Sequence, residues 1–242
     1  MMKKLREYRI SVFSIGWWFY VIVTFVLLAA MTAYTSSFTD EKKYRFILIV
    51  SVIELIILRI YKFSLKDIRS DYNYFNELPC YLCNQSTLMC IVASIIHDVP
   101  IMAYCVAVGT LGAVLAYVMP DSYNQDQRFF SKQAFGFYGY HGLLIVTCLS
   151  FYTMGLYEPK ISDCIWPAFY TFVLATIAHF LNLYLRKSGL NPRANYVFTI
   201  DPDNIILKKM YALLPVPLLY MLPVLPIFAT YSAILFAILG MF

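Results

Sequence analysis

Charged residues are scarce in this chain. Of its 242 residues, 14% are Asp, Glu, Lys or Arg, whereas 61% are apolar and the mean hydropathy is +0.66. Ordinary soluble domains average about 25% charged and about 45–50% apolar residues. The shortage of charge therefore excludes an ordinary soluble domain, a disordered segment and a nucleic-acid-binding protein. A lipid bilayer is the environment that accepts this much apolar surface.

Histidine and cysteine are also sparse, with three and six residues in the whole chain. Five of the six cysteines lie in apolar stretches, which argues against the disulfide framework of a secreted protein. Cys80 and Cys83 form a C-x-x-C pair, but no second pair or histidine cluster follows at the spacing of a structural zinc site. We therefore expect no metal site and no cofactor.

Long apolar runs account for most of the chain. The stretch from Ile10 to Thr39 carries no charge and is longer than a signal-peptide core of about 7–15 residues. A helix needs about 20 apolar residues to cross the hydrocarbon core. The sequence therefore predicts an all-α, polytopic membrane bundle that forms a single integral membrane domain over residues 1–242. The seven expected spans are residues 15–36, 46–61, 78–97, 99–119, 133–154, 165–185 and 211–240.

The positive charges predict how this bundle is oriented. When the seven spans alternate in direction, 15 of the 19 lysines and arginines fall on the side of the N-terminus. Lys3, Lys4, Arg6 and Arg9 all precede the first span. Cytoplasmic loops carry the excess of Lys and Arg in membrane proteins. We therefore expect the N-terminus inside and the C-terminus outside, in a multi-pass protein of the plasma membrane.

Four prolines interrupt the last apolar segment. They are Pro215, Pro217, Pro223 and Pro226, and each removes an intrahelical hydrogen bond and bends the helix. As one helix, residues 211–242 would extend ~48 Å, which is too long for one straight span and too short for two. The pattern favours an interfacial stretch followed by a proline-kinked span. Its role is either that of a bent packing helix or that of a lateral opening through which a lipid enters.

Seven ionisable or strongly polar side chains within the expected spans fall in the cytoplasmic half. They are Glu54, Cys83, Asn84, Gln85, His141, His179 and Asn182. At 1.5 Å per residue, Cys83 lies ~8 Å and His141 ~12 Å from the inner ends of their helices. Polar groups inside a membrane are costly and often mark functional sites. Their shared depth predicts one site on the cytoplasmic side.

Several of these residues also have a purely structural interpretation. Cys83 belongs to a stripe of small residues on one helix face, a pattern that permits close packing in membranes. His141 follows a glycine- and aromatic-rich run that lets a backbone or a ligand approach closely, so it is either a buried structural group or a base. Glu54 is either neutral or paired with Arg59 or a histidine.

Three short motifs occur in an order that resembles a known family. They are Leu78-Pro79-Cys80-Tyr81-Leu82-Cys83, then His141-Gly142, then Asn195-Tyr196 followed by Asp201-Pro202. This order is similar to that of the YwaF-like integral membrane family, which includes transmembrane protein 164. The resemblance is strongest over residues 78–225. The first motif of the family often reads Leu-Pro-Leu-His-Leu-Cys, so this chain departs from it at Cys80 and Tyr81.

The resemblance implies a seven-helix acyltransferase-like fold and Cys-dependent transfer of a fatty acyl chain between phospholipids. It implies Cys83 as the nucleophile and His141 as the base. The predicted oxyanion or orienting groups are Asn84, Gln85, Asn182 and Asn195. The expected supporting residues are Glu54, His179 and Tyr196. The expected partner is a phospholipid or lysophospholipid of the cytoplasmic leaflet, and hydrolysis of a lipid acyl ester is the variant in which water accepts the acyl chain.

Two other functional classes remain open from the sequence. A transporter or ligand-binding component with a polar cytoplasmic-side cavity would explain the proline-broken helix, since broken helices often line substrate sites. A polar pathway through the bundle would favour that class, and a cavity closed on the outer side would count against it. A membrane thiol oxidoreductase would use Cys80 and Cys83 and would need a redox cofactor or a second cysteine pair.

Overall fold

The computed structural model describes residues 9–67, 72–120, 124, 127–203 and 205–241, and this part of the chain is almost entirely helical. Within it, the only sheet consists of two short strands, β1 (Arg9–Ile10) and β2 (Gln127–Arg128), which pair antiparallel. The prediction of an all-α fold is confirmed. Four of the positive residues on the predicted inner side, Lys3, Lys4, Arg6 and Arg69, lie outside the described residues.

The helices follow one another in chain order. α2 (Ile15–Thr35) and α3 (Asp40–Ser64) come first, and α3 continues into the turn η1 (Leu65–Asp67). The turn η2 (Tyr74–Asn76) precedes α4 (Leu82–Ile96). One continuous stretch comprises α5 (Val99–Tyr104), η3 (Cys105–Gly109) and α6 (Thr110–Val118), and another comprises α7 (Lys132–Ala134), η4 (Phe135–Gly139) and α8 (Tyr140–Thr153). The remaining elements are η5 (Ile161–Cys164), α9 (Ile165–Lys187), η6 (Tyr196–Phe198), α10 (Ile205–Leu213), η7 (Leu219–Met221) and α11 (Val224–Leu239).

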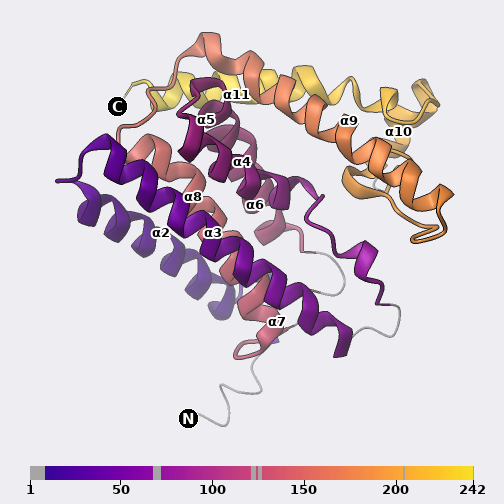
Figure 1. The fold of residues 1–242 in the computed structure, drawn as a ribbon, viewed down its shortest axis with the longest axis horizontal. Helices are drawn as coiled ribbons and strands as arrows, with labels where there is room; N and C mark the ends of the chain where they lie inside the picture. The colour runs from indigo at the N-terminus through magenta and orange to yellow at the C-terminus, as the bar shows by residue number, and fades with distance from the viewer. Residues whose placement is uncertain (1–8, 68–71, 121–123, 125–126, 204, 242) are drawn as a thin grey trace.

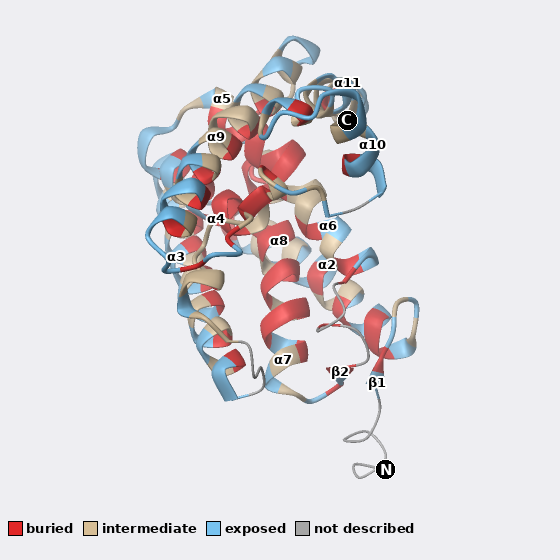
Figure 2. Ribbon diagram, turned by 90° about the vertical axis from the view of Figure 1, so that its right-hand side faces the viewer, coloured by how far each residue is buried: buried red, intermediate tan, exposed pale blue. Residues whose placement is uncertain are grey.

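The bundle has central helices and helices that cover them. In Figure 1, α2 and α3 lie at the lower left, α9 and α11 cross the top, and α4, α5 and α6 lie between them. Figure 2 shows α8 as the most continuously buried helix of the centre. In the most apolar window of Lys132–Thr153, 72% of the residues are buried, against 11% in that of Leu219–Leu239. Polar groups on α4 and α8 are therefore shielded from lipid, whereas α11 presents most of its surface to it.

Five helical stretches in the described residues are long and apolar enough to cross a membrane. They are Ile15–Thr35, Val99–Val118, Lys132–Thr153, Ile161–Lys187 and Leu219–Leu239. The other two predicted spans differ in composition or length. α3 has 25 residues but carries charged side chains along much of its length, and α4 is an apolar helix of 15 residues. The composition of the long helices makes this a membrane protein with several apolar helices.

The predicted spans differ from the observed helices where backbone chemistry intervenes. The span expected at 78–97 begins only at Leu82, because Pro79 disfavours a helical conformation at Leu78 and Tyr81 is still extended. Two of the spanning stretches contain a π-helical turn, η3 and η4. Such turns insert an extra residue into a helix and are frequent at functional sites. The turn η4 ends two residues before His141.

The last segment is broken rather than kinked, which corrects the predicted boundaries. α10 starts at Ile205, ahead of the predicted start at 211, and ends before Pro215 and Pro217. A turn centred on Leu219–Met221 then leads into α11, where Pro223 is the N-cap and Pro226 lies in the first turn. Proline is tolerated at these positions because the first amides of a helix have no intrahelical acceptor. The prolines therefore separate two helices.

Gly136 in η4 provides a test of the packing between η4 and α3. A Cβ at this position would lie 2.1 Å from Cδ2 and 2.8 Å from Cβ of Tyr61. We expect Gly136→Ala to destabilise the protein by about 1–3 kcal/mol, because neither packed helix can withdraw freely. Gly112→Ala is the matched control, since its Cβ would meet no atom within 4 Å and alanine favours a helix by about 1 kcal/mol. Thermal melting in detergent checks both variants, and equal melting temperatures would contradict the close approach.

Candidate functional site

A cavity of about 410 Å³ brings Cys83 and His141 to the same space. Its walls come from α3, the start of α4 and the residues before it, the end of α6 and the residues after it, the helix that contains η4 and α8, and η6 with the segment that follows. The aromatic side chains on these walls are Tyr61, Tyr81, Phe137, Tyr140 and Phe198. Cys83 and His141 lie far apart in sequence, and the packing of α4 against α8 places them together.

Cys83 occupies the first turn of α4. Its thiol donates a hydrogen bond to Oδ1 of Asn84, with Sγ and Oδ1 3.4 Å apart. The amides of a helix's first turn have no intrahelical acceptor and carry the positive end of the helix dipole. Negative charge that develops near Sγ is therefore stabilised by the start of α4. Asn84 adds a donor, because its Nδ2 has no hydrogen-bond partner in the described residues and the side chain lines the cavity.

The orientation of His141 leaves one ring nitrogen available as a base. Its Nδ1 lies 2.8 Å from the carbonyl oxygen of Phe137, one turn earlier. A carbonyl oxygen only accepts, so Nδ1 carries the proton and the lone pair is on Nε2. The rings of Phe137 and Tyr140 flank the imidazole, with centroids at 4.7 and 4.9 Å. In the described structure Cys83 Sγ is paired with Asn84 and not with His141, so proton transfer between them requires a change of thiol rotamer or a bridging group.

Glu54 lies beneath the cavity in a network of hydroxyl groups. The carboxyl group is fully buried and accepts hydrogen bonds from Thr87 and from Thr147, the latter at 3.0 Å. The Thr87 hydroxyl lies 2.9 Å from the hydroxyl of Tyr140. This arrangement differs from the alternative pairing of Glu54 with Arg59 or a histidine, since Arg59 donates instead to the backbone carbonyl of Glu77. Glu54 therefore supports the floor of the cavity rather than its open space.

Tyr140 is the site residue that the sequence analysis overlooked. Its hydroxyl is 3.2 Å from the carbonyl oxygen of Cys83 and 3.3 Å from Oδ1 of Asn84. It thus connects the network around Glu54 to the residue that carries the thiol. A sequence signal did exist, because Tyr140 and Thr147 are two helical turns apart and share a face. That face is the one that meets Glu54.

Charged side chains line one end of the cavity. Lys62 Nζ lies 2.7 Å from Oε2 of Glu77 and 5.9 Å from the centroid of the Tyr81 ring. Glu77 is 3% exposed and Lys62 is 18% exposed, so solvent screens this ion pair only partly. Asp203 also lines the cavity. The cavity therefore has charge near Lys62 and aromatic and hydroxyl groups near Tyr140.

Three of the four predicted oxyanion groups do not line this cavity. Gln85 donates from Nε2 to the carbonyl oxygen of Leu174 on α9, at 3.2 Å. Asn182 donates to the carbonyl of Tyr196 and the hydroxyl of Thr199, and accepts from the amide of Tyr196. Asn195 bonds to the backbone of residues 200–201. Only Asn84 of the predicted group lines the cavity.

His179 and Tyr196 belong to the same structural cluster as Asn182. His179 Nδ1 lies 3.2 Å from the hydroxyl of Thr199. The hydroxyl of Tyr196 donates to the carbonyl of Phe75 and accepts from the amide of Leu78, 3.2 Å away. Burial raises the pKa of Tyr196, so this hydroxyl stays protonated and remains a donor. These residues fix the segment before α4 and the segment around η6, and thereby position Tyr81 and Phe198.

The remaining chemistry-bearing residues contain no assembled metal site. In the described residues no group of three or more His, Cys, Asp or Glu side chains is arranged to hold a metal ion. All six cysteines are free thiols. Cys80 packs with the cluster around Tyr196, whereas Cys83 packs with the central core. The two residues of the C-x-x-C pair thus face different surroundings.

Comparison with known proteins agrees with the resemblance of the three motifs. A family model described as the TMEM164 family matches residues 11–242, which is nearly the whole chain. No curated protein and no solved structure matches this chain. The match includes α2 and α3, which the short motifs did not cover. The chain therefore belongs to the TMEM164 family.

Proposed function

We propose that this protein is a membrane-embedded Cys/His acyltransferase that acts on the acyl chains of phospholipids or lysophospholipids in the cytoplasmic leaflet. The observation that carries the proposal is the shared cavity of Cys83 and His141, in which Nε2 of His141 is free to accept a proton. A thiol needs a nearby base to react as a thiolate. The cavity also offers Asn84 and the start of α4 as donors to an oxyanion.

The proposed reaction has two steps that balance in atoms and protons. Sγ of Cys83 attacks the carbonyl carbon of an acyl ester, His141 takes the thiol proton, and the tetrahedral oxyanion collapses to a thioester. The departing lipid oxygen receives that proton from His141. A second lipid hydroxyl then gives its proton to His141 and attacks the thioester, which restores the thiol. When water replaces that hydroxyl, the same steps hydrolyse the lipid.

The closed outer half of the bundle favours acyl chemistry over transport. Beyond the cavity, the Glu54 network is followed by fully buried side chains that include Cys90, Tyr104, Cys148 and Phe151. A transport pathway would need an open passage to the other side of the membrane, and these fully buried side chains fill that space. The cavity is polar at one end and enclosed at the other, which suits a reactant that enters and leaves on the same side.

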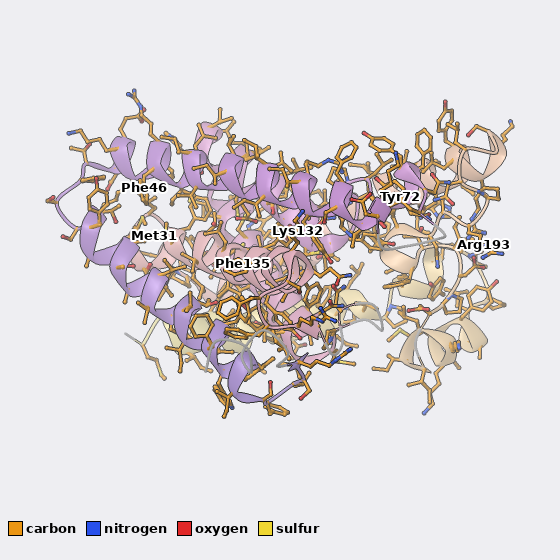
Figure 3. All side chains as sticks on the ribbon, turned by 90° about the horizontal axis from the view of Figure 1, so that it is seen from below. Met31, Phe46, Tyr72, Lys132, Phe135 and Arg193 are labelled. Atoms are coloured by element: carbon orange, nitrogen blue, oxygen red, sulfur yellow. The ribbon has the colours of Figure 1, made fainter. Side chains whose placement is uncertain are left out.

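We also infer seven spans, with the N-terminus inside and the C-terminus outside the plasma membrane. α3 and α4 would be the two spans that add to the five long apolar stretches, since both pack against other helices of the bundle. The hydrogen bond from Asn73 to the carbonyl of Leu190 joins two loops rich in positive charge, and Figure 3 has Tyr72 and Arg193 at the same end of the molecule. The far end of α11 lies instead beside Tyr152, whose hydroxyl donates to the carbonyl of Leu239.

Trapping the thioester tests the proposal directly. Purified protein in phospholipid vesicles is incubated with a phosphatidylcholine whose acyl chain ends in an alkyne, and modified peptides are mapped by mass spectrometry. We expect a hydroxylamine-sensitive acyl group on Cys83, which is absent from Cys83→Ala. Labelling of Cys80 in place of Cys83, or no thioester at all under conditions of measurable transfer, would contradict the assigned nucleophile.

A further inference from the structure

A second hollow lies beside the Cys83 cavity and is almost purely apolar. It is a groove of about 190 Å³ between α4, α9, α10 and the chain that leads into α11. Leu82, Ala175, Leu207, Met221 and Phe228 are among the side chains that form its surface. The hydroxyl of Thr171, a polar group at this surface, is already bonded to the carbonyl of Pro167 at 2.7 Å. A ligand here would gain burial of hydrocarbon and little hydrogen bonding.

The groove and the Cys83 cavity share two walls. Tyr81 and Phe198 line both spaces, so these two aromatic rings are the partition between them. Tyr81 lies two residues before Cys83. The partition therefore separates the place where an ester would react from a place that accepts only hydrocarbon.

The backbone at the partition is held in an unusual conformation. Val197 and Phe198 have φ values of 55° and 57°, in the left-handed region that side-chain-bearing residues rarely adopt. The bonds from Asn182 to Tyr196 and Thr199 bracket these two residues. Strained conformations persist where the surroundings over-determine them, and they cluster at ligand-binding positions. The position of the Phe198 ring is therefore fixed by the fold.

The groove is bordered by helices that face the lipid. α9 and α11 are among the least buried of the long apolar helices, and Leu219, Leu222 and Ile227 near the groove are 41%, 39% and 55% exposed. The break between α10 and α11 leaves Leu218, with a φ of 63°, at the edge of the groove. A lipid chain in the bilayer can approach this edge without crossing a charged surface.

We propose that this groove binds the hydrocarbon chain of a membrane phospholipid whose ester group lies in the Cys83 cavity, with the chain bending around Tyr81 and Phe198. The position of the ester rests on the proposed acyltransferase function, whereas binding of the chain in the groove does not need catalysis. The groove would hold the acyl chain of the substrate before transfer and that of the thioester afterwards. The break between α10 and α11 is then the lateral opening through which the lipid enters.

Photocrosslinking tests where the chain lies. The protein and its Cys83→Ala variant are placed in vesicles that contain phosphatidylcholine with a diazirine in the middle of one acyl chain, and adducts are mapped after irradiation. We expect adducts on groove residues of α9 and α11 in both proteins. Ala175→Trp and Met221→Trp narrow the groove from two sides and are each expected to lower these adducts several-fold. Ile227→Trp, on the lipid-facing side of α11, is the matched control and is expected to leave them unchanged.

The outcomes separate this proposal from the proposed function. Groove adducts that Ala175→Trp or Met221→Trp removes, in a protein without acyl transfer, would support the groove and overturn the catalytic assignment. Acyl transfer by a protein whose adducts are spread evenly over the lipid-facing helices would overturn the groove and leave the catalytic assignment intact. If Ala175→Trp does not fold, Met221→Trp still tests the groove, because Met221 is only partly buried and a larger side chain can be accommodated there.

Discussion

Replacing Cys83 with alanine is expected to lower the rate of acyl transfer by at least about 10³-fold, because loss of an essential nucleophile commonly costs this much or more. The measurement is kcat/KM for transfer from phosphatidylcholine to a lysophospholipid in vesicles. The loss should be in kcat rather than KM, since in the proposed reaction the thiol attacks the ester but contributes little to holding the lipid. The folded state should persist, because Cys83 is only partly buried and alanine suits the first turn of a helix.

Cys80→Ala is the matched control for this loss. Cys80 is also a partly buried thiol, three residues away, but it packs with the Tyr196 cluster and does not line the cavity. We expect the rate of acyl transfer by Cys80→Ala to stay close to that of the unsubstituted protein. His141→Ala should lose about 10²–10⁴-fold, the usual contribution of a general base. A Cys83→Ala protein that retains full turnover, or a Cys80→Ala protein that loses it, would overturn the assignment.

Asn182→Ala is expected to destabilise the protein by about 3 kcal/mol or more. Asn182 is fully buried, and its side chain satisfies the amide and carbonyl of Tyr196 and bonds to the hydroxyl of Thr199. Each buried polar group left without a partner costs about 1–3 kcal/mol. The measurement is the free energy of unfolding in mixed detergent micelles, together with kcat in vesicles below the melting temperature.

This prediction distinguishes a structural asparagine from a catalytic one. Asn195→Ala is the control, because Asn195 is partly exposed and its hydrogen bonds stay within residues 195–201, so we expect a loss of about 1 kcal/mol. An Asn182→Ala protein with unchanged stability but a greatly reduced kcat would restore the predicted oxyanion role. A large loss of stability with little change in kcat would confirm the bracing role.

The sequence predicts a similar depth for Cys83 and His141, but it does not predict the directions of the side chains around them. Counting residues from the ends of the spans gives the height of Cys83 and His141, and the structure has both on one cavity. Gln85 has almost the same height, yet two residues along a helix turn the side chain by about 200° and direct it to α9. Asn182 also has the right height, but α9 lies outside the central helices and turns Asn182 toward its own loop.

Boundaries of the helices were less predictable than their existence. Charged residues in the sequence mark where an apolar span ends, but they do not mark where its helix ends. In α3, charged residues at both ends continue the helix beyond the apolar run. A hydropathy pattern does not reveal that Pro215 and Pro217 separate two helices whereas Pro223 and Pro226 begin one. That difference depends on whether an amide is needed in a hydrogen bond, which only the surrounding backbone decides.

The pairing of β1 with β2 bears on the order in which the protein assembles. Arg9 and Ile10 hydrogen-bond with Gln127 and Arg128, so the start of α2 is tied to the chain just before the helix that carries His141. Contacts between residues this distant in sequence form late, because the intervening chain must first be ordered. During synthesis, the ribosome has to release all of α2 through α6 before β1 finds its partner. The end of the bundle that carries β1 is thus closed only after the strand beyond α6 has emerged, and α4 with Cys83 is synthesised before the helix that carries His141.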